Sequence, residues 1–166
     1  MATRQDEFEH TAMPHSRSLL RVARRLSSDA AGAEDLVQET LLLAWRNFHQ
    51  FRAGSNARAW LFRILFNSFY AQGRRQRAAP SQVPLSAAAT GAWSEPNADV
   101  ARALAALRKE HRTVLLLGIV EGFTCREMAD ILSVPIGTVM SRLSRARQAL
   151  RAQLTASTRC AGKEAS

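Results

Sequence analysis

The sequence predicts an all-α protein made of two small helical domains joined by a flexible linker. Val and Ile fall within patterns of helical period, and no hairpin dipeptide separates alternating runs. Apolar residues make up 46% of the 166 residues, which is typical of a globular protein. Residues 78–96 contain Pro80, Pro84 and Pro96 and have no sustained period, as in a linker. We therefore expect domains at 8–77 and 97–154, separated by a linker at 78–96.

Three helices are expected in the first domain, over residues 14–26, 33–48 and 56–76. The first has an apolar stripe formed by Leu19, Val22, Ala23 and Leu26. Gly54 and Ser55 interrupt the pattern before the third helix, whose N-cap is Ser55 or Asn56. In that helix we expect the core to contain Leu61, Ile64, Leu65 and Phe69.

The helix at 33–48 has an unusual polar side. Opposite its apolar face lie Asp35, Gln38, Glu39, Leu42, Trp45 and Arg46. A solvated face does not normally carry Leu42 and Trp45 among its charges. Either both side chains tuck under a neighbouring loop, or they are apolar anchors, rimmed by acids, that dock on a basic partner helix.

Residues 51–67 mix Arg and aromatic side chains around a Gly-Ser-Asn loop. Single-stranded DNA is bound in this way, because bases stack on aromatic rings while cations hold the backbone. A flexible loop beside such rings can enclose a base taken out of the stack. Some of these aromatic and apolar residues are expected in the core instead. Trp60 fits either interpretation, a core position or contact with single-stranded DNA.

The second domain carries the strongest local signal, a helix-turn-helix. Asn97 is a candidate cap for a helix with Val100, Leu104 and Leu107, and a second helix is expected over 111–121, before Gly122. Thr124 and Glu127 form a capping box for a short helix at 125–132, which buries Met128, Ile131 and Leu132. Ser133 and Val134 make the turn, and Pro135 suits the start of the next helix. A polar tail after Thr155 is expected to fray.

The last helix has an apolar line and an opposite basic face. Val139, Leu143, Ala146 and Leu150 form the line. The other face presents small residues and then Arg: Gly137, Thr138, Ser141, Ser144, Arg145 and Gln148, with Arg142 and Arg147 at its shoulders. No acid occurs between Gly137 and Arg151. Such a face suits a helix that reads base edges and grips phosphates in the major groove.

Composition supports a polyanionic partner. Lys and Arg number 23 against 14 Asp and Glu, a net charge of +9, and only Lys109 and Lys163 are lysines. DNA, RNA and an anionic membrane surface all fit such a charge, although it also serves solubility. Arg matches phosphates and guanine edges better than Lys does.

Several classes of protein are not expected. No run of 18 apolar residues exists, and the first nine residues lack the apolar core of a signal peptide. Cys125 and Cys160 make no CxxC pair and the four histidines are scattered, so no metal or cofactor is expected and a reducing cytoplasm is the simplest setting. No P-loop, GxSxG or HExxH motif indicates an enzyme.

Taken together, the motifs of the two domains resemble those of the extracytoplasmic-function sigma factor family. Residues 33–40 (AEDLVQET) with Ala44-Trp45 look like its region 2.2. Phe51-Arg52, residues 59–64 (AWLFRI) and Asn67 look like regions 2.3 and 2.4, and residues 122–147 look like region 4.2. The resemblance implies a factor that binds core RNA polymerase, directs it to promoters and promotes melting, and is commonly restrained by an anti-sigma factor.

The resemblance also implies roles for residues. Those expected at the clamp helices of core polymerase are Asp35, Gln38, Glu39, Leu42 and Trp45. Those expected at the melted −10 element are Arg52, Gly54, Ser55, Asn56, Trp60, Arg63 and Asn67. Those expected at the −35 element are Thr138, Ser141, Arg142, Ser144, Arg145 and Arg147.

Two departures and two alternatives accompany this hypothesis. Met140 stands where the family often has Lys or Arg, and Ser55-Asn56 follow Gly54 where an acid is common, which puts the −35 and −10 preferences in doubt. One alternative is a stand-alone helix-turn-helix regulator that binds a palindrome without polymerase. The other is a sigma mimic that titrates an anti-sigma factor, against which the Arg-rich last helix argues.

Overall fold

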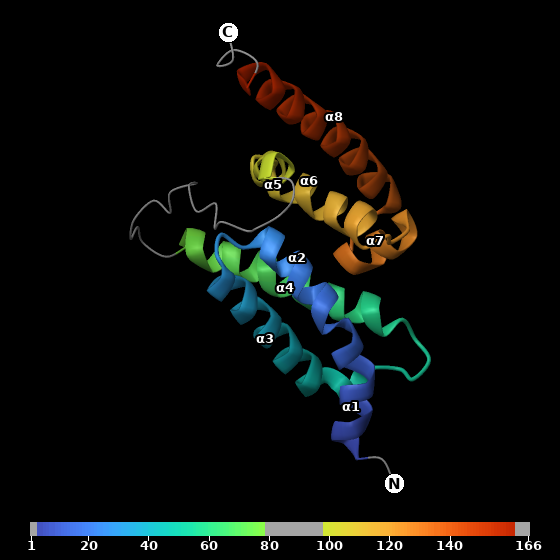
Figure 1. Cartoon of the computed structure of the whole chain (residues 1–166). Coiled ribbons are helices and arrows are strands. Elements are labelled where there is room, and N and C mark those ends of the chain that lie inside the picture. The colour runs from blue at the N-terminus through green and yellow to red at the C-terminus, as the bar shows by residue number, and fades with distance from the viewer. Residues whose placement is uncertain (1–2, 79–97, 162–166) are drawn as a thin grey trace. The chain divides into compact units, whose positions relative to one another are not determined.

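A computed structural model describes residues 3–78 and 98–161 (Figure 1). Within these ranges the chain forms helices and turns and no strand. It divides into two compact units, residues 1–89 (unit 1) and 90–166 (unit 2). The predicted all-α class with two helical domains is confirmed, whereas the expected linker lies, apart from Ala78, outside the described residues.

Unit 1 is a bundle in which α2 packs on α3 and α3 packs on α4, while α1 also contacts α4. Its elements are α1 (Arg4–Ala12), η1 (Met13–His15), α2 (Ser16–Leu26), α3 (Ala30–Asn47), η2 (Phe48–Gln50) and α4 (Ala57–Ala78). The expected stripe of α2 is fully buried, because Leu19, Val22, Ala23 and Leu26 all face the core.

Helix α1 is an element that we did not predict. Thr3 caps it through a capping box with Asp6, and it buries Phe8 and Ala12. Its sequence is mostly polar with one large apolar residue, so no apolar stripe marked it. The expected helix at 14–26 is also shorter than predicted, because Pro14 lies in η1 and α2 begins at Ser16.

Side-chain caps set the starts of the two long helices of unit 1. Asp29 Oδ1 accepts a hydrogen bond from Gly32 N at 2.7 Å, so α3 begins three residues earlier than predicted. Asn56 Oδ1 accepts one from Ala59 N at 3.0 Å, which makes Asn56 rather than Ser55 the cap of α4. These bonds satisfy amides that the first turn would otherwise leave without partners.

The buried face of α4 differs from the one we predicted. Leu61 and Leu65 are buried as expected, but Ile64 and Phe69 are only half-buried. Phe62 and Phe66 take their place and are almost completely buried. The buried face is thus rotated around α4 relative to the predicted one, because the helices that pack on α4 cover the side of Phe62 and Phe66, and the period alone did not show which side would be covered.

Unit 2 packs three shorter helices against a long one, with α5, α6 and α7 all contacting α8. Its elements are α5 (Ala98–Ala105), α6 (Lys109–Leu115), the π-helical turn η3 (Leu116–Val120), α7 (Cys125–Leu132) and α8 (Ile136–Ala161). The core consists of Ala103, Leu107, Val114, Leu115, Leu116, Leu117, Phe123, Met128, Ile131, Val139, Leu143 and Ala146. Asn97, the expected cap of α5, lies outside the described residues.

Two boundaries in unit 2 differ from expectation. The helix expected at 111–121 begins at Lys109 and widens into η3, where Glu121 N donates to Leu116 O at 3.0 Å. Helix α8 continues to Ala161, through the segment that we expected to fray after Thr155. Thr155 Oγ1 donates to Arg151 O at 2.8 Å, so this residue is part of the helix.

Candidate nucleic-acid and protein interfaces

Local hydrogen bonds shape the helix-turn-helix in unit 2. Thr124 Oγ1 accepts from Glu127 N at 3.3 Å, and Glu127 Oε2 accepts from Thr124 N at 2.8 Å, which is the predicted capping box. Helix α7 ends at Ser133, whose φ of 54° is left-handed. Val134 N then donates to Ala129 O at 3.1 Å. The chain therefore turns sharply before α8, and this turn sets the direction of α8 relative to α7.

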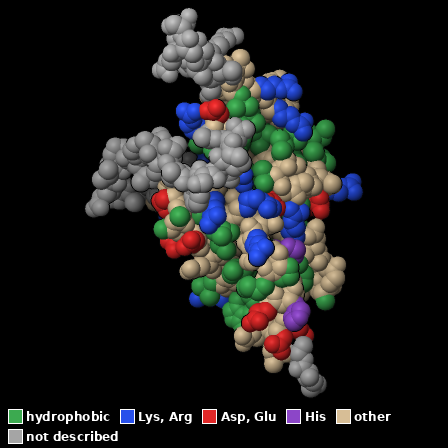
Figure 2. All heavy atoms as spheres, viewed as in Figure 1, with side chains coloured by type: hydrophobic (Ala, Val, Ile, Leu, Met, Phe, Trp, Pro, Cys, Tyr) green, Lys and Arg blue, Asp and Glu red, His purple; other side chains and the backbone are tan. Residues whose placement is uncertain are grey.

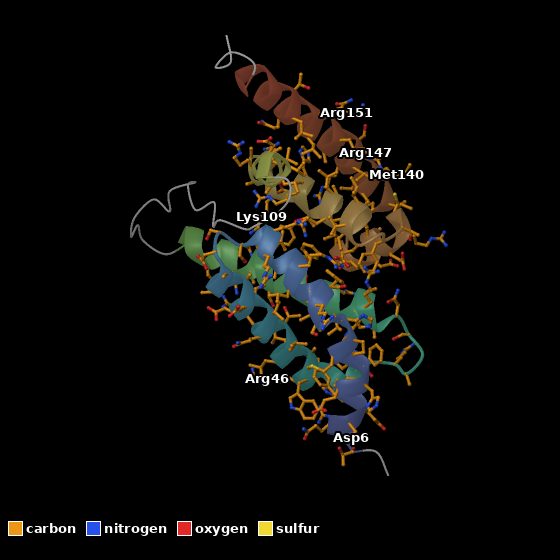
Figure 3. All side chains as sticks on the ribbon, viewed as in Figure 1. Asp6, Arg46, Lys109, Met140, Arg147 and Arg151 are labelled. Carbon is orange, nitrogen blue, oxygen red and sulfur yellow. The ribbon has the colours of Figure 1, made fainter. Side chains whose placement is uncertain are left out.

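The two sides of α8 are divided as predicted. Val139, Leu143 and Ala146 are buried, and Leu150 is half-buried. Of the candidate −35 residues, Ser141, Ser144, Arg145 and Arg147 are exposed, while Thr138 and Arg142 are half-buried. Arg side chains gather along α8, where Arg147 and Arg151 project from the helix (Figures 2 and 3). All six candidates lie on one helix that unit 2 holds by its opposite side.

The candidate loop of unit 1 connects η2 to α4. Arg52, Gly54, Ser55 and Asn56 are all exposed. Gly54 has a φ of 83°, a left-handed conformation that glycine adopts without strain. The Ser55 amide and hydroxyl both donate to Arg52 O, at 3.0 and 2.7 Å. The loop is thus a defined tight turn whose side chains remain accessible.

A cluster of five aromatic rings lies behind this loop. Phe48 stacks on Phe51 with centroids 5.8 Å apart, and Phe51 meets Trp60 at 5.0 Å. Phe8 from α1 lies 5.3 Å from both Phe48 and Trp45, edge to face. Trp60 is half-buried in this cluster, so it supports the loop as well as presenting part of its ring.

The aromatic side chains of α4 do not all remain available to a ligand. Phe62 and Phe66 belong to the core, so they cannot stack on bases. Arg63 and Asn67 are exposed on α4, where they are accessible to single-stranded DNA. The structure therefore leaves the loop, part of Trp60, and Arg63 with Asn67 as the accessible candidates of this site.

The polar side of α3 is divided into accessible and engaged residues. Asp35, Gln38 and Leu42 are exposed, and the side chain of Leu42 is 49% exposed despite being apolar. Trp45 instead packs under α1, where Arg4 lies 4.9 Å above its ring and donates to its carbonyl oxygen at 3.1 Å. Leu42 keeps the position expected of a docking anchor, whereas Trp45 is covered by a helix that we did not predict.

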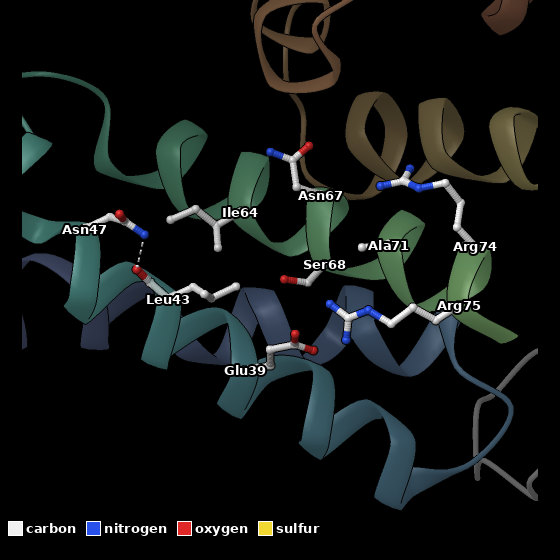
Figure 4. A pocket seen from close by; sticks show the side chains of 9 residues that line it. All are labelled: Glu39, Leu43, Asn47, Ile64, Asn67, Ser68, Ala71, Arg74 and Arg75. Atoms are coloured by element: carbon white, nitrogen blue, oxygen red, sulfur yellow. Dashed lines mark hydrogen bonds between the residues drawn. The ribbon is translucent and has the colours of Figure 1, made fainter. Parts of the chain in front are cut away.

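Glu39 lines a groove of about 370 Å³ between α3 and α4. Gln72 Nε2 donates to Glu39 Oε2 at 2.7 Å, and Figure 4 shows Glu39 reaching from α3 toward α4. Ser68 lines the same groove, and its buried hydroxyl has no hydrogen-bond partner. The remaining lining residues are Leu43, Asn47, Ile64, Asn67, Ala71, Arg74 and Arg75. No pattern in the sequence indicated that Glu39 and Asn67, predicted for different partners, would share one groove.

The described part of the chain contains neither a metal-binding cluster nor a membrane-spanning helix. No group of three or more His, Cys, Asp or Glu side chains in residues 3–78 and 98–161 is arranged to hold a metal ion. Among the described helices, none combines the length and apolar character needed to cross a bilayer.

Each of the two units matches a known protein family. Residues 12–79 match the model of Sigma-70 region 2, and residues 97–150 match that of Sigma-70, region 4. The ECF RNA polymerase sigma factor EcfG of Rhodopseudomonas palustris is 39% identical over 144 residues, which cover 82% of this chain and 79% of EcfG. The ECF RNA polymerase sigma factor SigL of Mycobacterium tuberculosis is 39% identical over 151 residues, which cover 84% of each chain.

A solved structure agrees with both. The sigma factor RpoE of Bartonella quintana, determined in complex with the anti-sigma factor NepR, superposes with a TM-score of 0.74 and 35% identity. The match covers 90% of this chain and 97% of RpoE. Sequence and fold thus agree over both units, and the chain belongs to the family of extracytoplasmic-function RNA polymerase sigma factors.

Proposed function

We propose that the protein binds core RNA polymerase, directs it to specific promoters through two separate DNA contacts, and promotes melting of the DNA. One observation carries the proposal: α8 of the helix-turn-helix exposes an Arg-rich, acid-free face, while unit 1 exposes a turn backed by aromatic rings. The first surface suits a duplex and the second suits a single strand.

The −35 contact is assigned to α8. Ser141 and Ser144 are small, so this part of the helix can approach base edges closely, and Arg145 is placed to reach a base or a phosphate. Thr138, Arg142 and Arg147 flank this line. Because the core residues of α8 lie on its other side, the helix can enter a major groove without disturbing unit 2.

The −10 contact is assigned to the loop of Arg52, Gly54, Ser55 and Asn56, with Trp60, Arg63 and Asn67. A base leaving the stack would rest in the turn against the exposed part of the aromatic cluster, while Arg side chains hold the backbone. Such captured bases favour the open strand over the duplex, so melting follows from differential binding. The protein supplies binding free energy, and we assign it no catalytic step.

The polymerase contact is assigned to α3. Asp35 and Gln38 supply polar groups and Leu42 the apolar anchor, an arrangement suited to a basic partner helix. Glu39 and Trp45 are also predicted for this contact. We assign them in addition the role of holding α3 in place, since Glu39 is bonded to Gln72 of α4 and Trp45 to Arg4 of α1. Since core polymerase and promoter DNA are its partners, we place the protein in the cytoplasm.

An anti-sigma factor is a further proposed partner. RpoE of Bartonella quintana, with which this chain shares 35% identity, was determined bound to one. We expect a comparable partner to cover the surfaces that this chain uses for polymerase and to keep it inactive.

Run-off transcription tests the proposal. The purified chain is combined with sigma-free core polymerase on genomic DNA fragments, and transcripts that start at defined sites only when the chain is present support it. Premelting the −10 region of such a template should reduce the dependence on the loop residues but not on α8. A stand-alone regulator would instead bind a palindromic site without polymerase, and a sigma mimic would yield no transcript at all.

A further inference from the structure

Two large apolar side chains are exposed on α8, the helix assigned to the −35 element. Ile136 is 47% exposed and Met140 is 58% exposed. They are four residues apart and hence neighbours on one side of the helix. The core line of α8 runs through Val139, Leu143 and Ala146, so neither residue is needed to hold α8 on unit 2.

The surroundings of this apolar pair favour close approach to a polyanion. At about 100° per residue, Met140 lies between Ile136 and Ser144 around the helix, and Gly137 follows Ser144. A Cβ at Gly137 would meet nothing within 4 Å, so the helix surface beside the pair is open. Arg147 and Arg151 continue the line of Met140 along α8 (Figure 3). The pair is therefore an apolar spot at the start of a cationic helix face.

We propose that Met140, supported by Ile136, contacts the C5-methyl group of a thymine in the −35 element and so determines part of the promoter preference. This inference rests on the proposed function of α8. The thymine methyl is the apolar group that base pairs display in the major groove, and apolar side chains recognise it. A thioether has neither a positive charge nor a hydrogen-bond donor for a phosphate, whereas the unbranched Met side chain can adjust its rotamers to contact one methyl group.

A protein partner is the other occupant that an exposed apolar pair could have. The charges beside Met140 favour DNA, because the segment from Gly137 to Arg151 contains basic residues and no acid. The pair is also small, and the exposed side chains near it on α8 include Ser141, Ser144 and Arg147, which can bond to base edges or phosphates as direct readout requires. DNA is therefore the occupant that we assign.

Replacing single thymines of the −35 element by deoxyuridine tests the proposal, because only the methyl group is removed. Holoenzyme made from core polymerase and the full chain is bound to one promoter in each form, and the ratio of the two affinities is measured. At one position the wild-type holoenzyme should bind the thymine form about fourfold more tightly, the effect of one buried methyl group. Met140→Ala should lower this ratio to about one, while Met140→Leu should keep most of it.

The matched control is Ile119→Ala, which removes a side chain 60% exposed in the same unit but outside α8. It should leave the thymine-to-deoxyuridine ratio unchanged. An equal ratio in wild type and Met140→Ala, with the promoter still bound, would overturn the inference while leaving the proposed function intact. If the ratio stays equal and Met140→Ala also binds an acidic protein more weakly than the wild type does, the apolar pair belongs to a protein interface, and the inference is again overturned. Failure of the wild-type holoenzyme to select any promoter would overturn both.

Discussion

The two units present their candidate residues in different ways. In unit 2 all six −35 candidates lie on α8, and the side chains that hold the helix lie on its opposite side. In unit 1 several candidates are also packing residues: Trp60 belongs to the aromatic cluster, Trp45 lies under α1, and Glu39 binds Gln72. Candidate binding residues and packing residues are thus largely separate in unit 2, whereas in unit 1 several residues belong to both groups.

This difference has a consequence for mutagenesis. A substitution on the exposed face of α8 should change DNA affinity and leave the free energy of unfolding almost untouched, since exposed positions contribute little to it. A substitution at Trp60 should change both DNA affinity and the free energy of unfolding, and one at Trp45 should change the free energy of unfolding together with polymerase affinity. Loss of function in unit 1 is therefore interpretable only when stability is measured on the same variant.

The largest expected effect is that of Phe8→Ala, which removes a ring that contacts both Trp45 and Phe48. We expect a loss of about 3–5 kcal/mol in the unfolding free energy of unit 1, because a buried aromatic side chain leaves a cavity. The sequence has three tryptophans, and replacing Trp93 by Phe leaves Trp45 on α3 and Trp60 on α4. In that background, Trp fluorescence follows the urea unfolding of unit 1. Leu42→Ala is the control and should change stability by no more than about 0.5 kcal/mol. A small effect of Phe8→Ala would show that α1 is not part of the core.

Arg145→Ala should have the next largest effect, and on binding only. Loss of a side chain that reads a base costs about 1–3 kcal/mol of promoter affinity and relaxes the preference at one −35 position. Holoenzyme binding to a set of single-base −35 variants measures this, with urea unfolding alongside. Unchanged transcription from the cognate promoter would contradict the role of Arg145, and a large loss of stability would contradict the separation of binding from folding in unit 2.

Thr124→Ala tests how far local caps hold the helix-turn-helix. The variant loses the hydroxyl that accepts from Glu127 N, and we expect unit 2 to lose about 1 kcal/mol of stability. Thr124→Ser keeps the hydroxyl and should behave like the wild type. Thermal unfolding followed by circular dichroism measures both. Equal stability of the Ala and Ser variants would show that tertiary packing alone sets the start of α7.

The smallest expected effect concerns His15 in unit 1. Burial lowers the pKa of His15 from its ordinary value of 6.5, and the positive charge of Arg58 lowers it further. The unfolded chain therefore binds more protons below that pH, so this contribution to stability is complete above about pH 6.5 and declines as the pH falls toward the pKa of the folded state. His15→Gln should reduce slightly the difference in melting temperature between pH 7.5 and 5.5. The same pH dependence in both proteins would show that His15 does not contribute.

Local chemistry explains which parts of the fold could be predicted from the sequence. The capping box of Thr124 and Glu127, the turn before Pro135 and the division of α8 into two sides all depend on residues within one or two helical turns. The same holds for the Asn56 cap and the Gly54 turn of the loop. The family resemblance rests largely on these segments, and the comparisons confirmed it.

Contacts between distant residues explain the rest. Helix α1 is held by Phe8 and by Arg4, which bonds to a residue 41 positions away, so its own polar sequence gave little indication of it. Glu39 meets a partner 33 positions away, and Phe62 and Phe66 are buried because several helices surround α4.

By itself, therefore, the sequence determined that the chain is helical, where its helix-turn-helix lies and which side of α8 is exposed, because hydrogen bonds and periodicity act over a few residues. Only the tertiary structure decided which polar and aromatic side chains of unit 1 remain accessible. That choice depends on which helices pack against each other, and so on contacts between residues far apart in the chain.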